Sequence, residues 1–239
     1  MNFTRKRSNT DYILKRSTIE QRELQILKRE QEKRKLTQTL LRVINEGNAQ
    51  SVFNDAVINN KIDIVTFLLN EVHPNCFIGN DTPLTIAVKK NYQDMARLLI
   101  DKGANPNLPN KSKQTPLTLS TSLGYETMTI ILLDKGANPN IPNKNGDTPL
   151  TIAAFKNYIN IAKILMNRKA DPNLFNKSGD TALMRASRYG FVEMVYALLS
   201  GGANPNLSHR ILHETALRMT YTSSRLEVYQ VLSAVGAAY

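Results

Sequence analysis

The sequence predicts an all-α protein, in which helix–turn–helix units stack into a solenoid behind an N-terminal capping helix. Two repeated segments predict this fold. Each returns every 33 residues along the chain, except that the last copy of the first segment comes after 34. Thr-Pro-Leu-Thr-Ile-Ala at 82–87 returns in close copies at 115–120 and 148–153, and in weaker copies from Thr181 and Thr215. Gly-Ala-Asn-Pro-Asn at 103–107 returns at 136–140, 169–173 and 202–206. Two markers in register indicate structural units that bury their apolar faces against one another.

Each unit should contain two helices and a turn. Thr82 can cap a helix that begins at Pro83, because proline has no N–H group to leave unpaired. We therefore expect a first helix over residues 82–91. The apolar spacing of residues 95–99 predicts a second helix, which should end at Gly103 because glycine readily adopts a left-handed conformation. The Asn-Pro-Asn segments that follow are typical of turns.

The region before the repeats is basic and contains a predicted helix. Residues 1–44 hold 12 basic and 5 acidic residues, more than half of the chain's net charge of +11. Ser17 and Glu20 form a capping-box pattern that opens a helix, and the apolar spacing near its end suits packing. We expect residues 1–16 to be a disordered basic arm and residues 17–47 to form a helix that caps the solenoid.

Composition restricts the class of protein. The hydrophobic fraction of 41% is ordinary for a folded protein. No stretch approaches the roughly 18 apolar residues of a membrane-spanning helix, and residues 1–16 lack the apolar block of a secretory signal. Cys76 is the only cysteine, which excludes an internal disulfide and a thiolate metal site. We expect a cytoplasmic protein without membrane insertion.

The repeated unit resembles the ankyrin repeat family, whose units open with Thr-Pro-Leu and share the period seen here. The resemblance covers residues 48–239 and implies six ankyrin repeats, of which the first is divergent and the last is terminal. Two departures stand out. The position after Thr-Pro-Leu, usually histidine in the family, holds Thr85, Thr118, Thr151, Met184 and Arg218. Lys169 stands where the other units have glycine, which should cost on the order of 1 kcal/mol.

No catalytic or metal-binding motif supports an enzyme. The sequence has no glycine-rich phosphate loop, no Gly-x-Ser-x-Gly segment and no His-Glu-x-x-His helix. His209 and His213 have a spacing that suits a metal on a helix, with Glu214 as a third ligand. They fall in a turn, however, and a solvated loop is the better interpretation. We expect Cys76 to be a buried structural thiol, and we assign neither a cofactor nor a metal.

The resemblance implies binding through a concave face, made of the exposed residues of each first helix and the turn tips. On the first helices these include Ile58, Asn59, Ser122, Thr222 and Ser223. The residues we select as partner-binding are Lys89, Lys90, Lys111, Leu123, Lys144, Phe155, Lys156, Phe175, Lys177, Arg188, Tyr189 and Arg210. Any single lysine in a turn is most simply a solvated charge. The set of cations as a whole has a different interpretation. The concave face is positive, while Glu193 and Glu227 lie on second helices that face away, so we expect the concave face to bind the partner.

These features favour a non-enzymatic scaffold that binds an acidic protein partner and is itself a monomer. The abundance of asparagine, with its Asn-Pro-Asn turns, resembles ankyrin proteins of intracellular bacteria and large DNA viruses, which implies a host-directed effector delivered into a host cell. The alternative is a nucleic-acid-binding or nuclear protein that uses the basic arm and the concave face. The clusters at 5–7 and 33–35 could then serve as a nuclear address.

Overall fold

The computed structural model describes residues 3–220 and 225–237, and their side chains from residue 20 onward. It divides into two compact units, residues 1–53 and 54–239. In the described residues the regular elements are helices, and the remaining extended pairing is limited to two isolated bridges, Ile78 with Asp81 and Ser208 with Thr215. The all-α fold class is therefore confirmed.

The first unit is dominated by one helix, α1 (Phe3–Asn45). It begins well before Ser17, so the disordered arm expected at residues 1–16 is a helix from Phe3 onward in the structure. The physical reason is that residues 3–45 contain neither proline nor glycine to interrupt a helix. Residues 28–35 are all exposed, as their charge predicts. The capping role expected for residues 36–47 stays a prediction.

Helix α1 ends in a left-handed turn. Gly47 has a φ of 74°, its N–H donates to the Ile44 carbonyl at 3.0 Å, and the Asn48 N–H donates to the Val43 carbonyl at 3.0 Å. This pair of bonds is the Schellman arrangement, which pairs the last free carbonyls of a helix. In the described residues, no helix is both long enough and apolar enough to span a membrane.

The repeats follow as pairs of short helices. The first helices are α2 (Ala49–Ile58), α4 (Pro83–Lys89), α6 (Pro116–Ser122), α8 (Pro149–Lys156) and α10 (Ala182–Tyr189). The second helices are α3 (Ile62–Leu68), α5 (Gln93–Asp101), α7 (Glu126–Asp134), α9 (Ile159–Asn167), α11 (Val192–Ser200) and α12 (Leu226–Ala234). In the sixth unit, the described residues at the place of the first helix form a 3₁₀ turn, η1 (Arg218–Thr220), and Thr222 and Ser223 lie outside the described residues.

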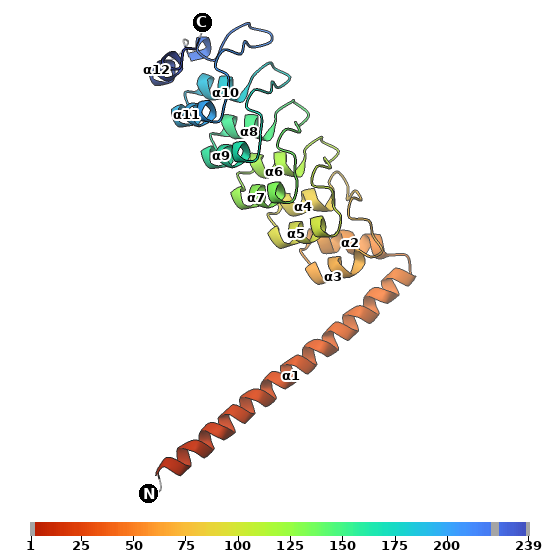
Figure 1. Ribbon diagram of the computed structural model, residues 1–239. Helices are drawn as coiled ribbons and strands as arrows, with labels where there is room; N and C mark the ends of the chain where they lie inside the picture. The colour runs from red at the N-terminus through yellow and green to blue at the C-terminus, as the bar shows by residue number, and fades with distance from the viewer. Residues whose placement is uncertain (1–2, 221–224, 238–239) are drawn as a thin grey trace. The chain divides into compact units, whose positions relative to one another are not determined.

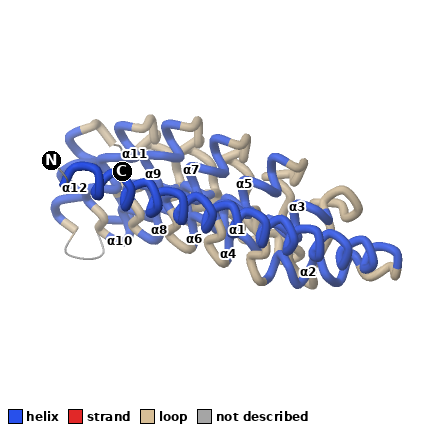
Figure 2. Tube along the Cα trace, turned by 90° about the horizontal axis from the view of Figure 1, so that it is seen from below, coloured by secondary structure: helices blue, strands red, loops and turns tan. Residues whose placement is uncertain are grey.

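The helices form two rows within the repeat unit. The first helices α4, α6, α8 and α10 lie side by side in one row, with the turns projecting beside them, and α5, α7, α9 and α11 form the second row (Figure 1). Figure 2 shows both rows from a second direction. One leucine from each of the last five units lies in the core, almost fully buried: Leu84, Leu117, Leu150, Leu183 and Leu217.

Threonine caps the first helices, as the sequence predicts. The Thr82 hydroxyl accepts a hydrogen bond from the Thr85 N–H at 3.2 Å, and equivalent bonds cap α6, α8 and α10. Thr85 also returns a bond, because its hydroxyl accepts from the Thr82 N–H at 2.8 Å. The threonine that stands at the expected histidine position therefore supplies hydrogen bonds of its own within the cap.

The second helices end at left-handed residues. Gly103, Gly136 and Gly202 have φ values of 93°, 86° and 89°, and Lys169 is held at 66° in the same position. A residue with a Cβ is strained in this conformation, whereas glycine adopts it freely. The strain predicted for Lys169 from the sequence therefore has a structural basis.

Lys169→Gly should stabilise the protein by about 1 kcal/mol, because it removes this strain. Urea unfolding of the full chain measures the change as a shift of the midpoint to higher concentration. Lys163→Gly is the matched control: Lys163 is exposed in the middle of α9, where glycine should instead destabilise by about 1 kcal/mol. Equal effects of the two variants would contradict this account.

Neighbouring repeats are joined by asparagine side chains, which we call the Asn clamps: Asn75, Asn107, Asn140 and Asn173. In each clamp the side-chain oxygen accepts from a backbone N–H of the next unit at 2.7–2.8 Å. The side-chain nitrogen donates to a backbone carbonyl of that unit at 3.2–3.3 Å. For Asn107 the partners are the Asn138 N–H and the Gly136 carbonyl. One amide thus fixes two points of the following repeat.

Asn107→Ala should lower the free energy of unfolding by about 1–3 kcal/mol, because two hydrogen bonds between repeats are lost at once. Asn107→Asp keeps the acceptor and loses the donor, so its effect should be intermediate. Urea unfolding measures both. Asn145→Ala is the control, since this exposed turn asparagine makes no side-chain hydrogen bond with the described residues. If Asn145→Ala shifted the midpoint as far as Asn107→Ala, the clamps would have no special role.

Candidate partner-binding surface

The selected residues of the first helices occupy two adjacent positions of the repeat, at the end of each helix. Lys89 ends α4, Leu123 follows α6, Phe155 lies in the last turn of α8, and Tyr189 ends α10. Leu123, Phe155 and Tyr189 are 42%, 41% and 49% exposed, which is high for large apolar side chains. Stacking of the units therefore presents a row of exposed side chains along the ends of the first helices.

An aromatic cluster lies in the middle of this row. The rings of Phe155 and Tyr189 meet edge to face with centroids 5.4 Å apart, and Tyr189 stacks on Phe191 at 5.8 Å. The Arg185 guanidinium lies over the Phe155 ring at 5.2 Å. Sequence reasoning brings Phe155 and Tyr189 together but misses Arg185 and Phe191. The repeat period places Lys156 and Tyr189 at the same position of successive units. Residues close to these two in the sequence could therefore have been considered as part of the cluster.

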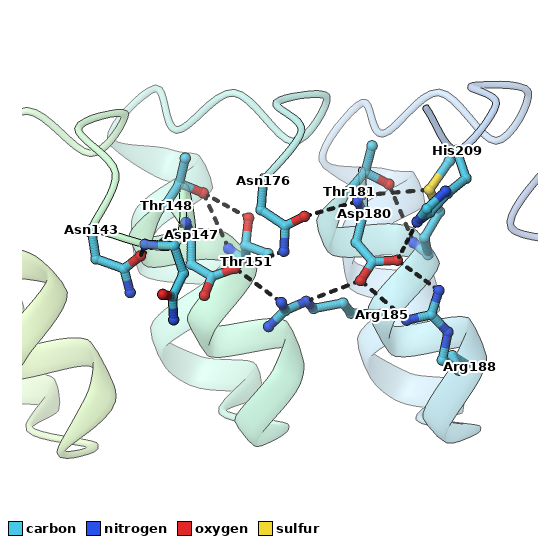
Figure 3. A network of polar contacts seen from close by, with 12 residues as sticks. Asn143, Asp147, Thr148, Thr151, Asn176, Asp180, Thr181, Arg185, Arg188 and His209 are labelled. Carbon is cyan, nitrogen blue, oxygen red and sulfur yellow. Dashed lines mark hydrogen bonds and ion pairs between the residues drawn. The ribbon is translucent and has the colours of Figure 1, made fainter. Parts of the chain in front are cut away.

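Two buried carboxylates, Asp147 and Asp180, contact Arg185, the arginine that lies over Phe155 (Figure 3). Arg185 bridges them, at 3.0 Å from Asp147 and 3.6 Å from Asp180. Arg188 binds both oxygens of Asp180, at 2.7 and 3.1 Å. Buried carboxylates need such partners, because an unpaired buried charge is costly.

This network changes the role of Arg188. The sequence analysis selects it as a partner-binding cation, but its guanidinium is engaged by Asp180 within the protein. The same holds for Lys89, whose ammonium lies 2.7 Å from Asp81. Both charges are therefore compensated internally, and they contribute less to the positive potential of the concave face than the sequence suggests.

Asp81 repeats this arrangement two units before Asp147. Its carboxylate accepts from the Asn110 side chain at 2.8 Å, as Asp147 does from Asn176. Burial raises the pKa of the Asp81 carboxyl, but hydrogen bonds from Lys89, Asn110 and Thr85, together with the Lys89 charge, outweigh burial and hold the pKa below its usual value. The carboxylate is thus charged and structurally engaged at neutral pH.

The turn tips carry a second row of cations, Lys111, Lys144, Lys177 and Arg210, all of them exposed. Lys111 lies over the Phe77 ring at 5.5 Å, and Arg210 lies over the Phe175 ring at 4.8 Å. Phe77 is missed by the sequence analysis because the first repeat is divergent. None of these four cations, nor Lys90 or Lys156, forms an ion pair with a described residue. Six of the selected positive charges are therefore uncompensated by the part of the chain that the structure describes.

The comparison with protein families now decides the identity of the repeats. The family described as ankyrin repeats (3 copies) matches residues 29–110, 53–143 and 125–209, which together span most of the chain. The chain belongs to the ankyrin repeat family. Ankyrin repeats are in general protein–protein interaction modules, and the family typically consists of non-enzymatic scaffolds.

Solved structures agree with this assignment. The ankyrin repeat protein EF0377 is similar with a TM-score of 0.69 and 26% identity, over 76% of this chain and 96% of its own. In total, 526 chains of solved structures match, so the ankyrin fold by itself does not identify a partner. The search of curated proteins finds no match.

The expected solvated loop of the sixth ankyrin repeat is different in the structure. His209 is 4% exposed, and its Nε2 lies 3.5 Å from Asp180, whereas His213 is exposed. His209 occupies the position of Asn110 and Asn176 in earlier repeats, which explains its burial. In the described residues, no three His, Cys, Asp or Glu side chains are grouped to hold a metal ion. Cys76 is half-buried rather than fully buried.

Proposed function

We propose that this protein is a non-enzymatic ankyrin scaffold that binds an acidic protein partner through its concave face. The observation that carries the proposal is the aromatic cluster of Phe155, Tyr189 and Phe191, in which Phe155 and Tyr189 are exposed and Phe191 is half-buried. Six uncompensated cations flank it. Aromatic side chains at the centre of a surface and charges around it are typical of protein-binding sites.

The cluster is suited to anchor a partner. Its rings are already held by one another and by Arg185, so little side-chain freedom is lost on binding. Two buried carboxylates in turn fix Arg185. A preorganised anchor of this kind supplies binding energy that an isolated exposed phenylalanine does not.

The charges favour an acidic partner. The uncompensated cations are distributed along the turn tips and at the ends of α4 and α8, on both sides of the aromatic cluster. Complementary charge chiefly accelerates association and selects against basic partners. We propose that the cations of the turn tips accelerate association with the partner, and that the aromatic cluster supplies most of the affinity.

The alternative function is nucleic-acid binding through the basic N-terminal helix and the concave face. The 12 basic residues of residues 1–44 favour it. Binding of bases needs free aromatic faces, however, and Tyr189 already stacks on Phe191 while Arg185 covers Phe155. These contacts favour the protein partner.

We further propose a cytoplasmic monomer. The host-directed effector role and a nuclear location remain proposals from the sequence alone. They are tested by following the full chain in cells of the source and of a host.

Phe155→Ala with Tyr189→Ala should abolish capture of the partner while the fold persists, because both side chains are exposed. Affinity capture with the wild-type full chain and with the double variant, in parallel, identifies proteins that only the wild type retains. Loss of one hot-spot side chain costs at least about 2 kcal/mol, or about thirtyfold in affinity.

The matched control is Glu193→Lys, an exposed residue of α11 on the second row of helices. It should capture the same proteins as the wild type. If the double variant also retained them, or if the control lost them, the binding site would lie elsewhere.

Charge reversal of Lys111, Lys144 and Lys177 to Glu should slow association with the captured partner and flatten its salt dependence, with a smaller effect on dissociation. Surface plasmon resonance at two salt concentrations measures both rates. Tight, steeply salt-dependent binding of a duplex of about 20 base pairs by the wild type, lost in this variant, would favour the nucleic-acid alternative.

A further inference from the structure

The turn tip of the sixth repeat differs from the others in carrying exposed apolar side chains. Ile211 and Leu212 are 66% and 55% exposed, directly after Arg210. In the three preceding tips the cation is followed by a polar residue, Ser112, Asn145 or Ser178. The sixth turn is also one residue longer than these three. We call residues 210–212 the apolar tip.

The apolar tip is held from beneath by His209. The Nδ1 atom of this buried histidine accepts the N–H groups of Ile211 at 3.2 Å and Leu212 at 3.0 Å. Its other ring nitrogen faces Asp180, which Arg188 also binds (Figure 3). The backbone of the tip is therefore fixed to α10, and its two apolar side chains are presented without the entropy loss of ordering a flexible loop.

A hollow of about 420 Å³ lies beside the apolar tip. Ile211, Leu212 and Met219 provide its apolar lining. Its charged lining residues are Arg188, Arg218, Asp180 and Glu214. This volume falls within the range of sites that hold a small ligand or a side chain. The hollow can therefore accept an apolar side chain from outside.

The charged residues that line the hollow balance one another, and the cation beside it that the described residues leave uncompensated is Arg210 of the apolar tip. Asp180 is already neutralised by two arginines, and Glu214 lies 3.8 Å from Arg218. Arg210 has no ion-pair partner in the described residues, and the Arg218 side chain is 62% exposed. A partner group that enters here gains most if it is negatively charged.

We propose that the apolar tip and its hollow bind an extended peptide segment in which an apolar residue adjoins an acidic one. The apolar side chain enters the hollow against Ile211 and Leu212, and the carboxylate faces Arg210. This site deepens the proposed function, on which it rests, by naming a sequence pattern in the partner. It is separate from the aromatic cluster on α8 and α10.

A second copy of the chain is a poorer occupant. A symmetric contact places the same patch of both subunits against itself. Arg210 of each copy would then approach Arg210 of the other, and like charges facing each other disfavour association. The uncompensated charge of Arg210 thus points to an acidic peptide.

The test uses the full chain and a library of short peptides of randomised sequence. Selected peptides should share an apolar residue next to Asp or Glu. Their affinities are then measured by fluorescence polarisation for the wild type and for Ile211→Ser with Leu212→Ser. The double variant should bind at least about tenfold more weakly. Leu226→Ser is the control, because Leu226 on α12 is 66% exposed, the same as Ile211, and should change the affinity less than about twofold.

The outcomes separate this inference from the proposed function. Equal binding by the tip variant, together with loss of binding in Phe155→Ala with Tyr189→Ala, would overturn the inference and leave the proposed function standing. Selected peptides that need neither surface would overturn both. Peptides without the shared pattern, or a loss in Leu226→Ser as large as in the tip variant, would also overturn the inference. Unchanged thermal unfolding of the tip variant excludes loss of fold as the cause.

Discussion

The structure depends on one repeated interaction, the side-chain amide that clamps each ankyrin repeat to the next. Short helices of seven to nine residues, such as α4 and α5, are only marginally stable alone, so each repeat needs its neighbours. Apolar packing brings repeats together but tolerates sliding. The Asn clamps do not, because the same amide must reach an N–H group and a carbonyl of the following repeat. They therefore set the register in which the first helices and turns stack.

That register creates the candidate binding surface. Phe155 and Tyr189 are far apart in the chain and meet only because α8 and α10 are stacked neighbours. The buried carboxylates also hold neighbouring repeats in register, because Arg185 links Asp147 of one repeat to Asp180 of the next. The same network continues through His209 to the sixth tip. A surface built in this way is rigid before a partner arrives, and rigidity of this kind favours tight binding.

The sequence alone predicts much of the fold and part of the candidate binding surface. Repeat length, the threonine caps, the left-handed Lys169 and the neighbourhood of Phe155 and Tyr189 follow from local chemistry and the period. The sequence does not reveal that Arg188 is engaged by Asp180 or that His209 is buried, because both depend on which way a side chain points across a repeat boundary. For a similar reason the sequence shows the clamp asparagines only as turn residues. The early start of α1 escapes prediction because the capping-box pattern at Ser17 is interpreted as the start of the helix.

Native-state hydrogen exchange tests the clamps most directly. The N–H groups of Asn105, Asn138, Asp171 and Asn204 lie in exposed turns, yet each donates to a clamp from the preceding repeat. The account predicts that they exchange as slowly as the amides of the adjacent helices, because they open only when two repeats separate. Exchange as fast as that of unpaired turn amides would contradict it, and the register of the binding surface would then have to rest on apolar packing alone.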